Sequence, residues 1–417
     1  MAEPLMRIQV VCPHFEPDAA PTGVVMSEIV RGLVSRGHEV DVVTSLPWYP
    51  EHAVDEAWKG RIIRKETTRW GSTTRVYPFP ADKGSIAARA FGFAGFTALA
   101  CLCSLSRRRR PEVVMAMSPP LTLGLAAWLT ARLRRAPFVF NVQDVFPDVA
   151  VAVGAISNQR VIRLLEGLER FVYRRADAVT VLSEDLRVNV ESKIADRTAG
   201  DRVGDKVRII PNFVDVERIR PQERDNAYRS EFGLGARTVV MYAGNLGFSQ
   251  PLELMVEAAR SLADRDDVAF VINGGGSRRQ ELEVLARGLD NLLFVDYQPV
   301  ERLGEVLAAG DVHVIALRRG LGRSSVPSKL YSVLAAGRAV LASVDSGTEV
   351  ATVVSSQRAG LVVAPQDQEA FTAAVLDLVD NADLAAMGSA GRQFVLQWAS
   401  PDGVAEAYAD LFAELTS

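Results

Sequence analysis

Cysteine and excess charge are both scarce in this sequence. The 417 residues include only Cys12, Cys101 and Cys103. Three cysteines are too few for the disulfide framework of a secreted protein and favour a reducing compartment such as the cytoplasm. Lysine and arginine number 47 against 51 acidic residues, so no positive excess indicates a nucleic-acid partner. The N-terminus has only Arg7 before a short apolar run and lacks the pattern of a signal peptide. With 48% hydrophobic residues, the chain has the composition of a globular protein of two or three domains.

Long hydrophobic runs are also missing. The segment from Ala90 to Leu105 carries no charge, but its 16 residues fall short of the roughly 20 that a membrane-spanning helix needs. Four arginines follow at 107–110. Two interpretations stay open: a helix at a membrane surface with these arginines facing anionic headgroups, or a buried helix with a basic end. The protein is therefore expected to be cytoplasmic and, on the first interpretation, peripheral at the inner membrane face through residues 90–110.

Short apolar runs alternate with helical patterns along the whole chain. Strands are predicted at 7–12, 39–44, 112–117, 137–142, 178–182 and 207–210, and again at 238–242, 268–272, 292–295, 312–316 and 339–342. Such runs, apolar at almost every position, are typical of parallel sheets covered on both faces. The alternation restarts near residues 213–220. The sequence thus predicts an α/β protein of two doubly wound, Rossmann-like domains, 1–213 and 214–397, with ligand at the carboxyl ends of the strands between them.

Two loops that follow predicted strands are candidates for holding phosphate. Thr22 and Gly23 stand at a helix start, where backbone N–H groups favour anions. The first strand lacks the G-x-G-x-x-G of a dinucleotide site, so a plain helix cap is equally compatible. Gly275 lies in a triple-glycine turn at 274–276, which either allows close approach of a ligand or only forms a turn.

Polar side chains follow other predicted strands. Gln143 and Asp144 come after the strand at 137–142, where Asp144 can also cap a helix. Asn245 and Gln250 are neutral groups that can form hydrogen bonds. Lys329 opens a helix, where a cation opposes the helix dipole. An anionic ligand would explain its place there, and a solvated lysine is the alternative. No cluster of histidine and cysteine suggests a metal site.

A series of short motifs occurs in order along most of the chain. They are RGHEV at 36–40, SPP at 118–120, RAD at 175–177 with VLS at 181–183, IPNFVD at 210–215, YAGN at 242–245, PSK at 327–329 and AAGR at 335–338. Together they resemble the retaining glycosyltransferases of the GT-B fold, family 4. The segments 143–148 and 244–250 look most like the branch that builds bacterial surface polysaccharides, often from N-acetylated aminosugar donors. The resemblance implies an acceptor-binding first domain, a nucleotide-sugar-binding second domain, and a C-terminal helix (398–417) that returns to the first domain.

Several positions depart from the pattern of that family. Where the family usually has two glutamates, this chain has Ser324, expected to face the donor sugar, and Ser332, expected to face the ribose. Asn245 and Gln250 stand where an arginine and a lysine often bind the diphosphate, and Gln143 stands where a histidine is frequent.

Lys329 is then the main expected cation on the diphosphate, assisted by Arg318, Arg319 and Arg323. The resemblance therefore implies two groups of site residues. The catalytic group is Gln143, Asp144 and Ser324, and the donor-binding group is Thr22, Gly23, Asn245, Gln250, Gly275, Tyr297, Lys329 and Ser332.

The resemblance also implies a reaction. A UDP-sugar is the expected donor substrate, with no cofactor and no metal, and a lipid-linked saccharide or small hydroxylated molecule is the acceptor. The leaving diphosphate oxygen takes the proton of the acceptor on the same face of the sugar, so configuration is retained without a protein nucleophile. Two alternatives remain: a sugar-nucleotide epimerase of the same fold, and a binding or partner subunit with weak catalysis.

Overall fold

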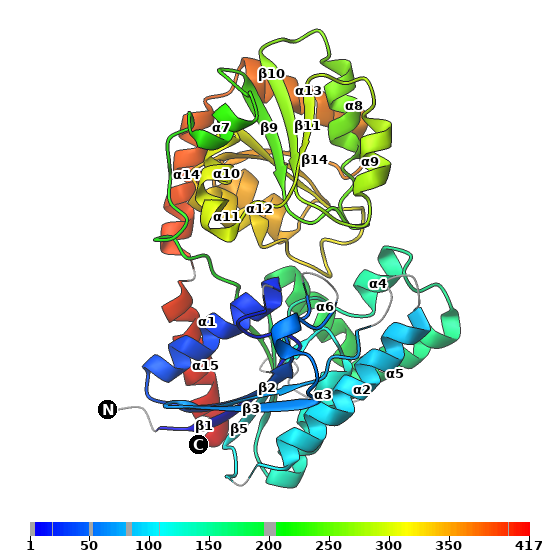
Figure 1. The fold of residues 1–417 in the computed structure, drawn as a ribbon, viewed down its shortest axis with the longest axis vertical. Coiled ribbons are helices and arrows are strands. Elements are labelled where there is room, and N and C mark those ends of the chain that lie inside the picture. Colours follow the sequence, from blue (N-terminus) through cyan, green and yellow to red (C-terminus); the bar gives the residue numbers. More distant parts are fainter. Residues whose placement is uncertain are drawn as a thin grey trace. The chain divides into compact units, whose positions relative to one another are not determined.

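The computed structural model describes residues 5–18, 20–49, 53–80, 86–107, 109–195, 206–398 and 400–417, with backbone alone for 86–90. The chain divides into two compact units (Figure 1). Unit 1 contains Met1–Asn212 and Pro401–Ser417, and unit 2 contains Phe213–Ser400. Within the described residues, no helix is both long and apolar enough to cross a membrane.

Unit 1 is built on a sheet whose described strands follow the order β3-β4-β2-β1-β5-β6-β7-β8. Only β3 runs antiparallel to its neighbour, β4. The strands are β1 (Arg7–Val11), β2 (Glu39–Ser45), β3 (Ile63–Thr68), β4 (Gly71–Val76), β5 (Val113–Ser118), β6 (Phe138–Val142), β7 (Ala178–Val181) and β8 (Val207–Ile209). The apolar runs of β5, β6 and β7 are buried at every position, as expected for strands covered on both faces.

Helices connect these strands. They are α1 (Pro21–Ser35), α2 (Ile86–Leu105), α3 (Thr122–Arg134), α4 (Asp148–Ala152), α5 (Gln159–Arg175) and α6 (Glu184–Ile194), with a short 3-10 turn at Glu56–Trp58. The C-terminal helix α15 (Pro401–Thr416) packs against α1, as the red and blue helices of Figure 1 show. Val404, Tyr408, Leu411 and Phe412 of this helix are buried, so the predicted return of the helix to the first domain is confirmed.

Unit 2 contains a second doubly wound sheet. All its described strands are parallel, in the order β11-β10-β9-β12-β13-β14. The strands are β9 (Thr238–Ala243), β10 (Val268–Asn273), β11 (Leu292–Val295), β12 (Val312–Ala316), β13 (Ala339–Ser343) and β14 (Gly360–Val363). The helices are α7 (Ala227–Glu231), α8 (Glu253–Ser261), α9 (Arg279–Leu285), α10 (Leu303–Ala309), α11 (Lys329–Ala335), α12 (Glu349–Ser356), α13 (Gln368–Asp380) and α14 (Leu384–Gln397), with a 3-10 turn at Val300–Arg302. The strand order reverses between β9 and β12, where doubly wound sheets commonly bind ligands.

The segment considered for a membrane surface is partly exposed and partly core. Phe91 is 80% exposed and Phe93 41%, whereas Phe96 is buried. The expectation that all four following arginines face headgroups is wrong for Arg107, which is buried and hydrogen-bonded to Asp41. A buried guanidinium needs such partners, and the strands of the sheet supply them.

The two exposed arginines that follow also have partners. Both carboxylate oxygens of Glu39 accept hydrogen bonds from Arg109, at 2.9 and 3.1 Å, and Arg110 donates to the carbonyl oxygen of Arg135. Arg108 lies outside the described residues.

Candidate functional site

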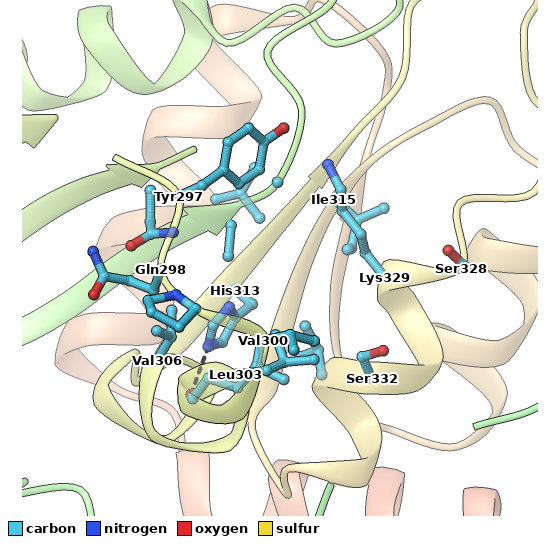
Figure 2. A pocket seen from close by; sticks show the side chains of 17 residues that line it. Tyr297, Gln298, Val300, Leu303, Val306, His313, Ile315, Ser328, Lys329 and Ser332 are labelled. Atoms are coloured by element: carbon cyan, nitrogen blue, oxygen red, sulfur yellow. Dashed lines mark hydrogen bonds between the residues drawn. The ribbon is translucent and has the colours of Figure 1, made fainter. Parts of the chain in front are cut away.

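A cavity of about 260 Å³ opens at the switch point of the unit 2 sheet. Figure 2 shows Tyr297 and Gln298 on one side of it and Lys329 and Ser332, from α11, on the other. The floor includes His313 of β12, whose burial lowers its pKa to about 4 and keeps the ring neutral. Its Nε2–H donates to the carbonyl oxygen of Leu307 at 2.9 Å. The rest of the wall is mainly apolar, which suits a planar ligand with few polar contacts.

Lys329 is the one lysine between residues 213 and 400 of the sequence, and it lines this cavity. Its ammonium group donates to the hydroxyl of Tyr242 and lies 3.9 Å from the centre of that ring. The Tyr242 hydroxyl in turn donates to the carbonyl oxygen of Asn245 at 2.6 Å. Burial lowers the pKa of Lys329 to about 7. No carboxylate within the described residues forms an ion pair with this lysine, so an anionic ligand would stabilise its charged form.

Gly244 brings the backbone after β9 against Lys329. Its φ of +140° favours glycine, and a Cβ there would lie 2.3 Å from Cε of the lysine. The glycine is therefore needed for the lysine to lie where it does.

The triple-glycine turn packs against the loop after β9. A Cβ on Gly274 would lie 1.9 Å from the carbonyl oxygen of Gly244, and one on Gly276 would lie 2.4 Å from that of Leu246. Gly275 accepts a hydrogen bond from the Tyr297 hydroxyl at 3.1 Å. The turn-only interpretation thus accounts for Gly274 and Gly276, while Gly275 supports the Tyr297 wall of the cavity.

The other expected residues of unit 2 lie outside the lining of this cavity. Asn245 is exposed, and the side-chain oxygen of Gln250 accepts a hydrogen bond from the backbone N–H of Gly247 at 3.2 Å. Ser324 is buried in the loop before α11. Because α11 spans only seven residues, the positive charge of the cavity comes from Lys329 rather than from a long helix dipole.

The three arginines that were expected to assist Lys329 do not line this cavity. Arg318 donates to the carbonyl oxygen of Phe248 at 2.5 Å and lies 3.7 Å from Glu253. Arg319 and Arg323 line a separate cavity of about 620 Å³ at the ends of β13 and β14. Their expected contact with the diphosphate stays a prediction.

In unit 1, Gln143 belongs to a buried chain of amides and hydroxyls. Its Nε2 donates to the Asn141 side-chain oxygen at 2.8 Å, and its Oε1 accepts from Asn212 at 2.8 Å. Asn141 continues the chain by donating to Tyr408 of α15 at 2.8 Å and to Thr180 of β7 at 3.1 Å. Both ends of the Gln143 amide are thus engaged in holding β6, β7 and α15 together.

Asp144, half-buried, follows Gln143 at the end of β6. Thr22 and Gly23 lie at the start of α1, on the same edge of the sheet because β1 and β6 run in the same direction. A Cβ on Gly23 would lie 2.9 Å from that of His14, so this glycine lets the helix approach the loop after β1.

The loop after β1 also contains a pair that the sequence analysis missed. His14 Nδ1 lies 2.7 Å from a carboxylate oxygen of the buried Asp18. The imidazole is stacked on Trp48, with ring centres 5.6 Å apart, and meets the edge of Tyr49 at 5.3 Å. The position of a histidine directly after the first strand was the signal that could have found it.

In unit 2, Gln298 was missed in the same way. It lines the cavity and its side-chain oxygen accepts a hydrogen bond from Arg302 at 2.7 Å. Like Tyr297, it follows a strand that ends at the edge of the sheet. The described residues contain no group of three or more His, Cys, Asp or Glu side chains that could hold a metal ion.

Two protein families match successive parts of this chain. Residues 22–212 match the family described as Glycosyl transferase 4-like domain, and residues 237–381 match the family described as Glycosyl transferases group 1. The two matches fall in unit 1 and unit 2, respectively.

Individual relatives agree with these families. WcaI of Escherichia coli (strain K12), assigned as a glycosyl transferase of colanic acid biosynthesis, is 28% identical over 89% of this chain and 91% of its own length. A protein of Mycobacterium tuberculosis, described as a GDP-mannose-dependent alpha-(1-6)-phosphatidylinositol monomannoside mannosyltransferase, is 27% identical over 70% of this chain and 79% of its own. The solved structure of HepE from Anabaena, in complex with UDP and glucose, has a TM-score of 0.69 at 14% identity, covering 98% of this chain and 100% of that chain.

Proposed function

Since this chain belongs to the glycosyltransferases of the GT-B fold, we propose that it is a retaining, metal-independent enzyme of family 4 that uses a UDP-sugar. The acceptor in this proposal is a lipid-linked saccharide or a small hydroxylated molecule, and the pathway is the synthesis of a surface polysaccharide. The epimerase alternative is not favoured, because the matched families and relatives are glycosyltransferases.

The observation that carries the proposal is the placement of Lys329 in the switch-point cavity. A nucleotide base can lie against the apolar wall near Tyr297 and Val300, with the ribose toward Ser332. The diphosphate then reaches Lys329, whose ammonium has the Tyr242 hydroxyl but no carboxylate as a partner among the described residues. A charge-assisted hydrogen bond of this kind contributes about 1.5–3 kcal/mol.

Uracil is the proposed base because the sequence resembles enzymes that use UDP-sugars. The cavity volume of about 260 Å³ accommodates either a single-ring or a two-ring base, so it does not decide between them. HepE was solved with UDP, which agrees with this choice, whereas the mycobacterial relative is GDP-mannose-dependent. GDP-sugars are therefore the comparison that the donor assay must include.

Retention in this proposal requires positioning and charge stabilisation rather than a nucleophile. The acceptor oxygen attacks the anomeric carbon on the face that the diphosphate leaves, and the departing phosphate oxygen takes the acceptor proton. Lys329 stabilises the negative charge that develops on the diphosphate. Ser324 and the edge formed by Gln143 and Asp144 remain the proposed contacts to donor sugar and acceptor.

A membrane surface is proposed for the exposed phenylalanines of unit 1. Phe79, Phe91 and Phe93 are each at least 40% exposed. Phe79 packs against α2, the helix that carries Phe91 and Phe93, because a Cβ on Gly95 of α2 would lie 3.0 Å from the ring of Phe79. Aromatic side chains of this kind insert into the headgroup region, which would bring a lipid-linked acceptor to the enzyme.

The test is a donor panel. The protein is incubated with UDP-, GDP- and dTDP-sugars, including N-acetylated aminosugars, and release of the nucleoside diphosphate and the anomeric configuration of the product are measured. The proposal predicts that UDP is released from a UDP-sugar and that the product keeps the anomeric configuration of the donor. Release from GDP-sugars alone would contradict the choice of base, an inverted product would contradict retention, and binding of UDP without any turnover would favour the partner-subunit alternative.

A further inference from the structure

A polar cavity of about 740 Å³ lies in unit 1 between the β3–β4 hairpin, the start of β2 and the segment after α2. Glu39 begins β2 and Gly71 begins β4, so the cavity lies at the amino ends of these parallel strands. The edge that carries Thr22 and Gln143 is at the carboxyl ends. The cavity is thus on the opposite edge of the sheet from the proposed acceptor contacts in the same unit.

Positive charge exceeds negative charge around this cavity. Its lining includes the cations Lys65, Arg69, Arg107 and Arg109 and the carboxylates Glu39 and Asp41. The two carboxylates are already engaged, Glu39 by Arg109 at 2.9 Å and Asp41 by Arg107 at 3.0 Å. Lys65 and Arg69 are exposed and form no ion pair within the described residues. The positive charges of Lys65 and Arg69 are therefore available to pair with an anionic ligand.

The side chain of Arg107 lines the bottom of this cavity and is held in place by hydrogen bonds. Its side chain is only 8% exposed, and it donates to the hydroxyls of Ser72 and, at 2.7 Å, of Thr74. Its Nε–H and the hydroxyl of Thr68 are buried and have no hydrogen-bond partner within the described residues. These two groups are closed off from the cavity, so the binding of a ligand there depends on the exposed cations that line it.

We propose that this cavity binds an anionic saccharide, with its carboxylate or phosphate at Lys65 and Arg69. The half-exposed indole of Trp70 lines the cavity and offers an apolar face to a sugar ring, and the exposed Thr67 offers a hydroxyl. The volume lies within the usual range for small-molecule sites. The choice of a saccharide rests on the proposed function of the enzyme, whereas the binding of an anion rests on the charges alone.

The test is calorimetric titration of the full chain with a tetrasaccharide that alternates glucuronic acid and N-acetylglucosamine. A neutral N-acetylglucosamine tetrasaccharide, glucose 6-phosphate and inorganic phosphate are titrated alongside. The double variant Lys65→Gln/Arg69→Gln removes the two charges without breaking an ion pair of the described structure. The control Lys59→Gln/Arg61→Gln removes two exposed charges that precede the same hairpin but do not line the cavity, at the loss of one exposed ion pair between Lys59 and Glu56.

We expect the charged tetrasaccharide to bind the parent and the control equally, and the Lys65→Gln/Arg69→Gln variant about tenfold more weakly. A preference for glucose 6-phosphate would identify the anion as a phosphate rather than a uronic acid. Equal binding of the neutral tetrasaccharide, equal binding of inorganic phosphate, or an unchanged affinity in the variant would each overturn the proposal. Titration of UDP into all forms separates the two proposals. A parent protein that does not bind UDP would contradict the donor site, but it would not affect the proposal that this cavity binds an anion.

Discussion

Replacement of Lys329 by methionine is the sharpest perturbation of the proposed donor site. The change keeps an unbranched side chain, one atom shorter, and removes its charge. Near pH 7 the loss of one charge-assisted hydrogen bond, about 1.5–3 kcal/mol, corresponds to a roughly tenfold to hundredfold weaker affinity for UDP. Isothermal titration calorimetry measures this directly. Arg287→Ala is the control, because it removes an exposed cation of the same unit that does not line the cavity.

The pH dependence adds a second readout. Because burial lowers the pKa of Lys329 to about 7, only the shrinking protonated fraction can pair with the diphosphate as the pH rises further. A bound diphosphate favours the charged form, so the Kd for UDP should rise about tenfold per pH unit between pH 7.5 and 9. In Lys329→Met this dependence of the Kd for UDP on pH should be absent. A Kd that does not change with pH in the parent, or parent-like affinity in the variant, would refute the assignment of Lys329 to the diphosphate.

Three further perturbations test other parts of the account. Gly244→Ala places a methyl group against Lys329 at a backbone position with positive φ and should weaken UDP binding at least tenfold by calorimetry, whereas Gly288→Ala, at another positive φ but away from the cavity, should bind UDP like the parent. Tyr408→Phe removes the hydroxyl that joins α15 to β6 and β7 and should lower the free energy of unfolding by about 1–2 kcal/mol in urea, without changing the Kd for UDP. Phe91→Ser/Phe93→Ser should reduce co-sedimentation with anionic liposomes about tenfold at unchanged stability, and equal sedimentation would argue against the membrane surface.

Most of both sheets could be predicted from the sequence because their strands are buried on both faces. Such strands need apolar side chains at nearly every position, and β5, β6 and β10 are examples. The β3–β4 hairpin was missed for the opposite reason. β3 alternates between exposed and half-buried residues at the edge of the sheet, and β4 buries threonines and Arg75 instead of an apolar run. Its burial depends on partners from elsewhere in the chain, which local patterns do not reveal.

The expected site residues divide along the same line. Tyr297, Lys329 and Ser332 line one cavity. Lys329 could be expected there because it opens a recognisable helix, whereas Tyr297 and Ser332 were implied only by the family resemblance. Arg107 and Gln143 could not be interpreted locally. The run of arginines has the pattern of a charged surface, yet Arg107 is buried by contacts with strands more than 30 residues away. Gln143 is engaged by a helix at the far end of the chain through Asn141.

Photolabelling tests most directly whether the switch-point cavity of unit 2 is the nucleotide-sugar site. The protein is irradiated with a 5-azido-UDP-sugar, digested, and the labelled peptides are identified by mass spectrometry. The account predicts labelling in residues 297–303, next to the apolar wall of the cavity, with protection by excess UDP. Labelling confined to the cavity of Arg319 and Arg323, or labelling that excess UDP does not prevent, would contradict it.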